Sequence, residues 1–86
     1  MTEEKVKKQP KVIVFTTPTC TYCTQVKRYL KDKRVKFKEI DVSRDQKAAM
    51  DMQRKTRQQG VPQLWINNKP IVGFDRSKIN QMLNLK

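Results

Sequence analysis

The first apolar run of the chain predicts a buried strand. Residues 11–16, KVIVFT, are mostly apolar and rich in β-branched side chains, which is typical of a strand covered on both faces. Pro18 and Thr19 then end the strand. Over residues 21–33 apolar side chains recur at steps of three and four, which predicts a helix. The side chains expected on its apolar face are Tyr22, Val26, Tyr29 and Leu30.

The middle of the chain predicts a second strand and a second helix. Residues 35–42, VKFKEIDV, largely alternate apolar and polar side chains, as a strand with one buried face does. Ser43 is a residue type that caps helices, so we expect a helix over residues 44–58. Its inward side chains are expected to be Ala48, Ala49 and Met52, and we expect Met50 and Trp65 to be packing residues as well.

The last third of the chain predicts a hairpin and a final helix. Residues 63–67 and 70–74 are short apolar runs joined by Asn-Asn-Lys, which favours a tight turn. A helix starting at Asp75 or Ser77 follows, with Ile79, Met82 and Leu83 on one face. The order is therefore β-α-β-α-β-β-α. Strands joined by a helix are parallel and the hairpin is antiparallel, so we expect an α/β fold with a mixed four-stranded sheet.

Chain length and apolar content narrow the function classes. A chain of 86 residues suffices for one domain, which we expect over residues 11–86 after a loose polar arm at residues 1–10. The longest apolar run, Val12–Phe15, is far too short for a membrane helix. The charged N-terminus carries no secretory signal. We therefore expect a cytoplasmic protein without a membrane partner.

The charge balance is strongly basic. The formal net charge is +12, from 20 lysines and arginines against 8 acidic residues. The basic residues are spread along the chain, and few aromatic residues are present to stack on bases. This pattern favours a solvated basic surface, or one that steers anionic partners, over a nucleic-acid-binding module.

The segment TPTCTYCT contains both cysteines of the chain, Cys20 and Cys23. They are expected at the start of the first helix, where unpaired backbone N–H groups and the helix dipole favour a thiolate. Thiolate is the attacking species in disulfide exchange. Cys23 follows one turn later, within reach of a mixed disulfide on Cys20. We therefore interpret Cys20 as the nucleophile and Cys23 as the resolving thiol.

Two other uses of a cysteine pair fit this chain less well. A structural zinc site needs four ligands, and there is no histidine and no third cysteine. Such a site would need carboxylates or a second subunit, so we expect no metal. A structural disulfide across so short a loop would remove little chain entropy.

Three segments resemble the glutaredoxin family: VFTTPTCTYC, GVPQLWINNKP and VGFD, within residues 11–83. The resemblance implies a thioredoxin-like fold and thiol–disulfide oxidoreductase activity. It implies that Pro62 is cis and that Val61 offers its backbone N–H and C=O to an incoming cysteinyl peptide. The alternative is that Pro62 only opens a strand. Tyr22 matches the tyrosine of the family's CPYC motif and would flank the groove, although its helical phase also allows a core position.

The resemblance also implies glutathione as a co-substrate, with no tightly bound cofactor. Gly73 and Asp75 match the family's turn that holds the γ-glutamyl end of glutathione, whereas Phe74 departs from it. Asp75 could bind the glutathione amine or cap the last helix. The family often has a lysine where this chain has Thr17, so the glycine-end carboxylate would rely on Gln58 or a nearby basic side chain. The expected substrate-binding residues are Tyr22, Gln58, Val61, Pro62, Gly73, Phe74 and Asp75.

Two alternatives for the partners follow from the same resemblance. The turn containing Phe74 also resembles redoxins that supply ribonucleotide reductase and are reduced by thioredoxin reductase without a glutathione site. Thr21, where proline is common in the family, leaves open an iron–sulfur cluster held between two subunits. The leading expectation is a monomer that acts on glutathione and disulfide-containing proteins.

Overall fold

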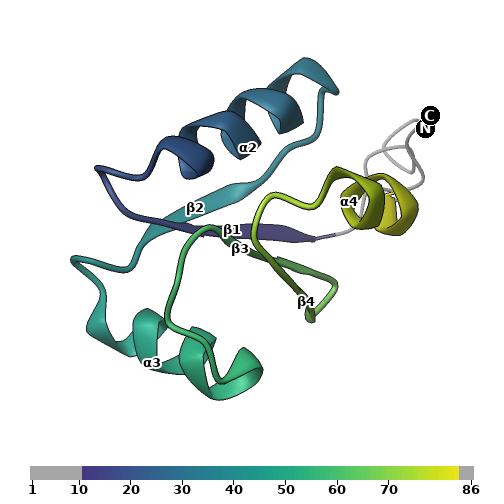
Figure 1. The fold of residues 1–86 in the computed structure, drawn as a ribbon. Helices are drawn as coiled ribbons and strands as arrows, with labels where there is room; N and C mark the ends of the chain where they lie inside the picture. The colour runs from purple at the N-terminus through teal and green to yellow at the C-terminus, as the bar shows by residue number, and fades with distance from the viewer. Residues whose placement is uncertain (1–10, 84–86) are drawn as a thin grey trace, which may run out of the picture.

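The computed structural model describes residues 11–83, which form one mixed sheet flanked by helices (Figure 1). The expected arm at residues 1–10 lies outside the described residues. The order β-α-β-α-β-β-α is confirmed. Its elements are β1 (Val12–Thr16), α2 (Thr21–Asp32), β2 (Lys38–Asp41), α3 (Gln46–Thr56), β3 (Gln63–Ile66), β4 (Lys69–Val72) and α4 (Arg76–Leu83).

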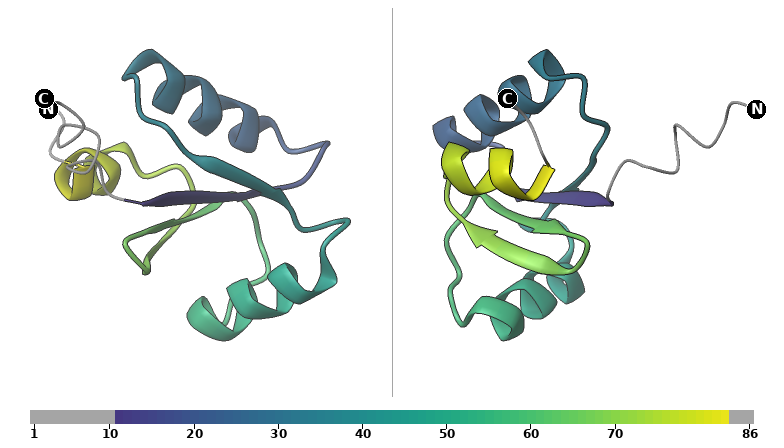
Figure 2. Two further views of the ribbon diagram at one scale, coloured as in Figure 1. Left: turned by 180° about the vertical axis from the view of Figure 1, so that it is seen from behind. Right: turned by 90° about the vertical axis from the view of Figure 1, so that its right-hand side faces the viewer.

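The sheet has the strand order β2-β1-β3-β4. β1 runs parallel to β2 and antiparallel to β3, and β3 pairs with β4 in a hairpin. Helices α2 and α4 cover one face and α3 covers the other (Figures 1 and 2). This arrangement confirms the thioredoxin-like α/β fold. Within residues 11–83, no helix combines the length and the apolar character needed to cross a membrane.

The two faces of β1 supply two separate cores. Val12 and Val14 belong to the cluster under α2 and α4, whereas Phe15 belongs to the cluster under α3, with Ile13 packed against it. Alternation along a strand requires this division, because successive side chains point to opposite faces. The prediction of a strand buried on both faces is confirmed. β1 therefore lies inside the protein, and its C-terminal end leads directly to the cysteine segment.

The predicted start of α3 was wrong by two residues. Asp45, not Ser43, caps the helix, and its Oδ1 accepts a hydrogen bond from the N–H of Ala48 at 3.0 Å. The Ser43 hydroxyl instead donates to Asp41 Oδ1 at 2.6 Å, which closes a turn after β2. Because the Ser43 side chain bonds within this turn, it does not cap the helix, which begins at Gln46. It ends at Thr56 because Arg57 adopts a left-handed conformation with φ 60°.

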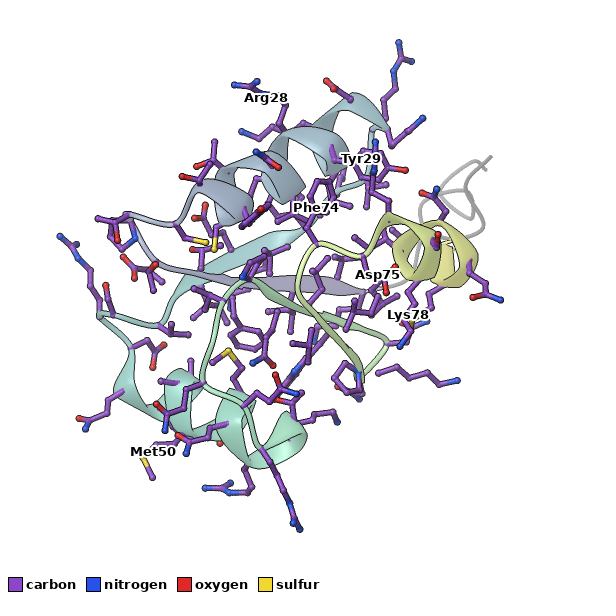
Figure 3. All side chains as sticks on the ribbon, viewed as in Figure 1. Arg28, Tyr29, Met50, Phe74, Asp75 and Lys78 are labelled. Atoms are coloured by element: carbon purple, nitrogen blue, oxygen red, sulfur yellow. The ribbon has the colours of Figure 1, made fainter. Side chains whose placement is uncertain are left out.

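Met50, expected to be a packing residue, lies on the surface, and Tyr22 lies on the surface rather than in the core position that its helical phase also allowed. Met50 is 53% exposed and points away from the protein (Figure 3), while Ala48 and Met52 take the inward positions of α3. Tyr22 is 62% exposed, because Cys23 takes the inward position on the first turn of α2. Trp65 does pack, with its ring 4.9 Å from that of Phe15.

Both outer strands are shorter than predicted. β2 begins at Lys38 rather than at residue 35, since Val35 packs in the core just after α2 instead of pairing in the sheet. β4 ends at Val72, because Gly73 has φ 81°, a conformation that interrupts a strand. This kink at Gly73 lies beside the segment that contains Cys20 and Cys23.

Candidate active site

Cys20 occupies the N-cap position of α2. Its backbone is extended (φ −92°, ψ 113°), and its Sγ accepts a hydrogen bond from the N–H of Cys23 at 3.0 Å. The sulfur thus takes the capping role that a serine or aspartate oxygen usually has at a helix N-terminus. Cys20 is half-buried, while Cys23 is only 1% exposed. One thiol can therefore meet a partner molecule, and the other lies behind it.

The loop before β3 faces Cys20. The Cys20 thiol donates to the carbonyl oxygen of Val61 at 3.7 Å, and the Val61–Pro62 peptide bond is cis, as the resemblance implied. The carbonyl of Pro62 accepts a hydrogen bond from the N–H of Gly73 at 2.9 Å. Through this bond the kink after β4 lies next to the cis-proline. The segments around Cys20, Pro62 and Gly73, which are distant in sequence, therefore lie next to one another.

A shallow groove of about 280 Å³ lies at this meeting point. It is mainly apolar, and an extended peptide could lie along it. A larger hollow of about 370 Å³ lies along α3 and Arg57. We assign the site to the smaller groove, because its lining includes Val61, whose carbonyl accepts a hydrogen bond from Cys20. The groove is lined by five of the predicted residues: Tyr22, Val61, Pro62, Gly73 and Phe74.

The other two predicted binding residues lie outside the groove lining. Asp75 follows Phe74, and its Oδ1 accepts a hydrogen bond from the N–H of Lys78 at 3.2 Å, so Asp75 caps α4 (Figure 3). Within residues 11–83, the cap bond uses Oδ1 alone of the two carboxylate oxygens. Gln58 is exposed, and its carbonyl accepts a hydrogen bond from Gln63. The structure therefore places Asp75 at the edge of the site and does not bring Gln58 into the groove.

Gln63 is a supporting residue that the sequence analysis missed. Its side chain is fully buried, and its Nε2 donates to the carbonyls of Gln58 and Gly60, both at 2.9 Å. Its Oε1 accepts from the Thr56 hydroxyl at 2.9 Å. These bonds hold the loop that carries Val61. A polar residue at an inward position of an otherwise apolar strand is the signal that could have revealed it.

The second thiol is held in its protonated form. Burial raises the pKa of Cys23 to about 12, and the hydrogen bond with Cys20 adds to this effect. The backbone of Thr17 and the ammonium of Lys27 act in the opposite direction, lowering the pKa of Cys23. With Cys23 protonated and buried, the half-buried sulfur of Cys20 is the one available for a first reaction.

A polar network was also not predicted. The buried Thr16 hydroxyl donates to Glu39 Oε2 at 2.9 Å, and the same oxygen lies 2.7 Å from Lys27 Nζ. From the sequence, Lys27 lies one turn past Cys23 and is expected to raise the local positive potential around the thiolate only slightly, because solvent screens its charge. The hydrogen bond from Lys27 lowers the pKa of Glu39 most, and the bond from Thr16 lowers it further, so the carboxylate stays charged.

The donor set of the site suits thiol chemistry. Both cysteines are free. Among residues 11–83, no three histidine, cysteine or acidic side chains are grouped so that they could hold a metal ion. The arrangement offers one half-buried sulfur at a helix N-terminus, a second sulfur behind it, and a groove lined by Val61, whose backbone carbonyl lies beside the first sulfur. These are the parts needed for disulfide exchange.

Comparisons with known proteins agree with this chemistry. Residues 12–71 match the Glutaredoxin family model. The uncharacterized glutaredoxin-like 8.6 kDa protein in the rubredoxin operon of Clostridium pasteurianum is 36% identical over 70 residues, covering 81% of this chain and 93% of that protein. A glutaredoxin of Pseudomonas aeruginosa is 35% identical over 66 residues, with coverages of 77% and 79%. The crystal structure of a Methanosarcina mazei glutaredoxin superposes with a TM-score of 0.80 at 31% identity, covering 87% of this chain and 79% of that one.

Proposed function

Because this chain belongs to the glutaredoxin family and is a thiol–disulfide oxidoreductase, we propose that it reduces disulfides through Cys20 and Cys23 with glutathione as reductant. One observation carries the proposal. The sulfur of Cys20 lies at the start of α2 and 3.7 Å from the carbonyl of Val61, at the edge of an apolar groove. A peptide bound in that groove would bring its own sulfur to Cys20.

The first step is attack by the Cys20 thiolate on a substrate disulfide. The new S–S bond joins Cys20 to one substrate sulfur, and the other sulfur departs as a thiolate that takes a proton from water. The substrate backbone would donate an N–H to the Val61 carbonyl, as in a short strand pairing. Tyr22 and Phe74 would contact its side chains from either side. The groove therefore positions the substrate, and Cys20 performs the exchange.

The second step releases the substrate. Cys23 loses its proton and attacks the sulfur of Cys20, so that the Cys20–Cys23 disulfide forms and the substrate leaves reduced. Two glutathione molecules then restore the dithiol by two further exchanges and leave as glutathione disulfide. We place this cycle in the cytoplasm, where the glutathione pool is reducing. The partners proposed are glutathione and disulfide-containing proteins.

Several features support glutathione. The groove accommodates a short peptide, and Asp75 at its edge keeps one carboxylate oxygen outside the helix cap, where it could accept the glutathione amine. Glutathione is an anion at neutral pH, and the net charge of +12 would attract it. This part of the proposal depends on Asp75 serving both as a cap and as a ligand.

Reduction by thioredoxin reductase is the second candidate, with ribonucleotide reductase as a possible recipient of the electrons. The role of Asp75 as a helix cap favours this second candidate, because one carboxylate oxygen already accepts a hydrogen bond from Lys78 and is less available to glutathione. Thr17, on the cysteine loop, supplies no cation for a glutathione carboxylate. An enzyme reduced by a protein partner would need neither group.

A coupled assay separates the two candidates. NADPH consumption is followed with hydroxyethyl disulfide or insulin as substrate, with glutathione plus glutathione reductase in one reaction and thioredoxin reductase alone in the other. Turnover with glutathione supports the leading proposal, and turnover only with thioredoxin reductase replaces it with the second. Cys20→Ser is the control that must lose activity. Full activity of that variant would refute the role of Cys20 under either reductant.

A further inference from the structure

We propose that Lys27, held by Glu39, is a positioning residue for the second step: its ammonium group stabilises the negative charge that develops on the sulfur of Cys23. The inference rests on the proposed function, because it concerns the release step of the same dithiol cycle. It gives a role to the ion pair of Lys27 and Glu39, which the proposed dithiol cycle does not otherwise use.

The release step faces an electrostatic obstacle. Cys23 must become a thiolate to attack, yet its side chain is 1% exposed. Burial raises the pKa of this thiol to about 12, so at neutral pH the thiolate is rare. Once Cys20 is part of a mixed disulfide it carries no negative charge, and its own opposition to a charge on Cys23 disappears. The groups that remain to favour the thiolate are the backbone of Thr17 and the ammonium of Lys27.

The position of Lys27 suits this role. It follows Cys23 by four residues on α2, which places both side chains on the same helical face. Its Nζ lies 2.7 Å from Glu39 Oε2 on β2, so the long side chain crosses from the helix to the sheet instead of extending into water. Its side chain is 27% exposed. An ammonium held in this way is screened less than a freely moving surface lysine.

Glu39 is itself fixed by a buried group. The same oxygen that meets Lys27 accepts the Thr16 hydroxyl at 2.9 Å, and Thr16 is 1% exposed at the end of β1. Thr16 immediately precedes the loop that carries Cys20. The ion pair is thus anchored to the strand that supports the reactive segment, and the ammonium has a defined place beside α2.

The charges around this cluster come from three parts of the chain. Cys20 lies on the loop before α2, and Lys27 lies on α2. Glu39 and Asp41 lie on β2, where each is affected by the charge of Lys27. Of the two members of the ion pair, Lys27 is the one whose charge favours a thiolate on Cys23, where it lowers the pKa of the thiol. We therefore assign the electrostatic role to the lysine and the anchoring role to the glutamate.

The step balances without any further reactant. The proton of Cys23 passes to water, its sulfur attacks Cys20 Sγ, and the bond between Cys20 and the substrate sulfur breaks as the new disulfide forms. The departing substrate thiolate takes a proton from water. Lys27 keeps its proton throughout, and the two electrons of the dithiol leave with the substrate.

The test follows both steps in one reaction with an aryl disulfide, 5,5′-dithiobis(2-nitrobenzoate). Reduced protein releases one coloured thiol when Cys20 attacks and a second when Cys23 resolves the adduct, so stopped-flow absorbance gives two rates. The variants are Lys27→Met, Lys27→Arg and Glu39→Gln. The matched control is Arg28→Met, which removes the same charge from an exposed neighbour that points away from the sheet (Figure 3). Rates are measured from about pH 6 to pH 9, the range in which thiolates form.

We expect Lys27→Met to slow the second release about fivefold at neutral pH, the effect of one partly screened unit charge, and to shift its pH profile upward. The first release should change by less than about twofold, because Cys20 already has the helix terminus. Arg28→Met should match the wild type, and Lys27→Arg should restore most of the second rate. Glu39→Gln keeps an acceptor for Lys27 but loses the opposing charge, so its second release should be unchanged or faster.

Two results would overturn the inference. If Lys27→Met and Arg28→Met give the same second rate, the ammonium has no effect on Cys23. If Glu39→Gln slows the second release as much as Lys27→Met, the pair acts as a scaffold or a base, not through the charge of the lysine. Absence of the first release in the wild-type protein would instead refute the proposed function itself. Thermal unfolding of each variant identifies any that fails to fold. If Lys27→Met does not fold, the second rate of Lys27→Arg is compared with that of the wild type instead.

Discussion

Replacing Gln63 with leucine should loosen the loop that carries Val61 and Pro62. The glutamine is fully buried and makes three hydrogen bonds, two to loop carbonyls and one with the hydroxyl of Thr56. Leucine has a similar size and no polar atoms. The substitution therefore removes the bonds while largely keeping the packing of β3 against its neighbours.

The magnitude follows from these contacts. A hydrogen bond contributes about 1 kcal/mol net, so three bonds contribute about 3 kcal/mol. Burying an apolar side chain in place of an amide returns about 1 kcal/mol. The carbonyls of Gln58 and Gly60 belong to exposed residues, so water can reach them. We therefore expect the free energy of unfolding to fall by about 2 kcal/mol, which lowers the Tm of a domain of this size by roughly 8 to 16 °C.

Urea unfolding, followed by the fluorescence of Trp65, measures the loss. Thr56→Val removes one of the three bonds and also the bond that Thr56 Oγ1 accepts from the N–H of Gln58 at 3.2 Å, so it should cost about 2 kcal/mol. In the coupled assay, Gln63→Leu should raise KM for a peptide disulfide more than it lowers kcat, because the loop positions the substrate backbone and Cys20 performs the chemistry. A change in unfolding free energy below about 0.5 kcal/mol would show that the buried amide does not hold the loop.

The remaining predictions concern the two thiols and two side chains at the groove. Cys20→Ser should lower kcat/KM by at least about a hundredfold with either reductant, since serine is not a nucleophile in disulfide exchange, and the circular dichroism spectrum should not change. Because the pKa of Cys23 is raised to about 12 from 9.0, the folded state binds its proton more tightly; stability from this group is complete below about pH 9 and is lost as pH rises toward 12. Cys23→Ser should show a weaker decline of Tm over that alkaline range, and an identical decline in both proteins would contradict the assigned burial effect. Asp75→Ala should cost about 1 kcal/mol through loss of the α4 cap, whereas Asp75→Asn should keep the cap and raise only KM for glutathione if the carboxylate binds its amine. Tyr22→Ala should leave the unfolding free energy within about 0.5 kcal/mol of the wild type, because the ring is exposed, and should raise KM for peptide disulfides; an unchanged KM would remove Tyr22 from the groove.

Local patterns in the sequence were enough to predict the elements and the position of the cysteines. The apolar run at residues 11–16 and the helical spacing after Pro18 placed Cys20 at the junction of β1 and α2, where the structure has it. Such patterns succeed because burial on a strand or a helix repeats with a fixed period along the chain. The start of α3 was not predicted correctly, because two nearby residues can each cap a helix. Ser43 bonds to Asp41 in a turn, and Asp45 caps the helix instead.

Family resemblance added what periodicity could not, namely the cis bond before Pro62 and the groove beside it. It also suggested Gln58 as a ligand, whereas the structure turns the backbone of this residue toward Gln63 and leaves it outside the groove. The difference arises because a loop residue is directed by the bonds that its neighbours make.

The pairing of polar side chains became visible once the elements were packed together. Glu39 meets Lys27 across 12 positions of the chain and Thr16 across 23, and no local pattern connects residues so far apart. Gln63 is an amide at an inward position of an apolar strand, and only the packed structure shows which groups it bonds. The sequence predicted Cys20 and Cys23 as the groups that carry the chemistry. Their pairing, burial and charge followed from packing distant elements against one sheet, because each pair forms only when those elements come into contact.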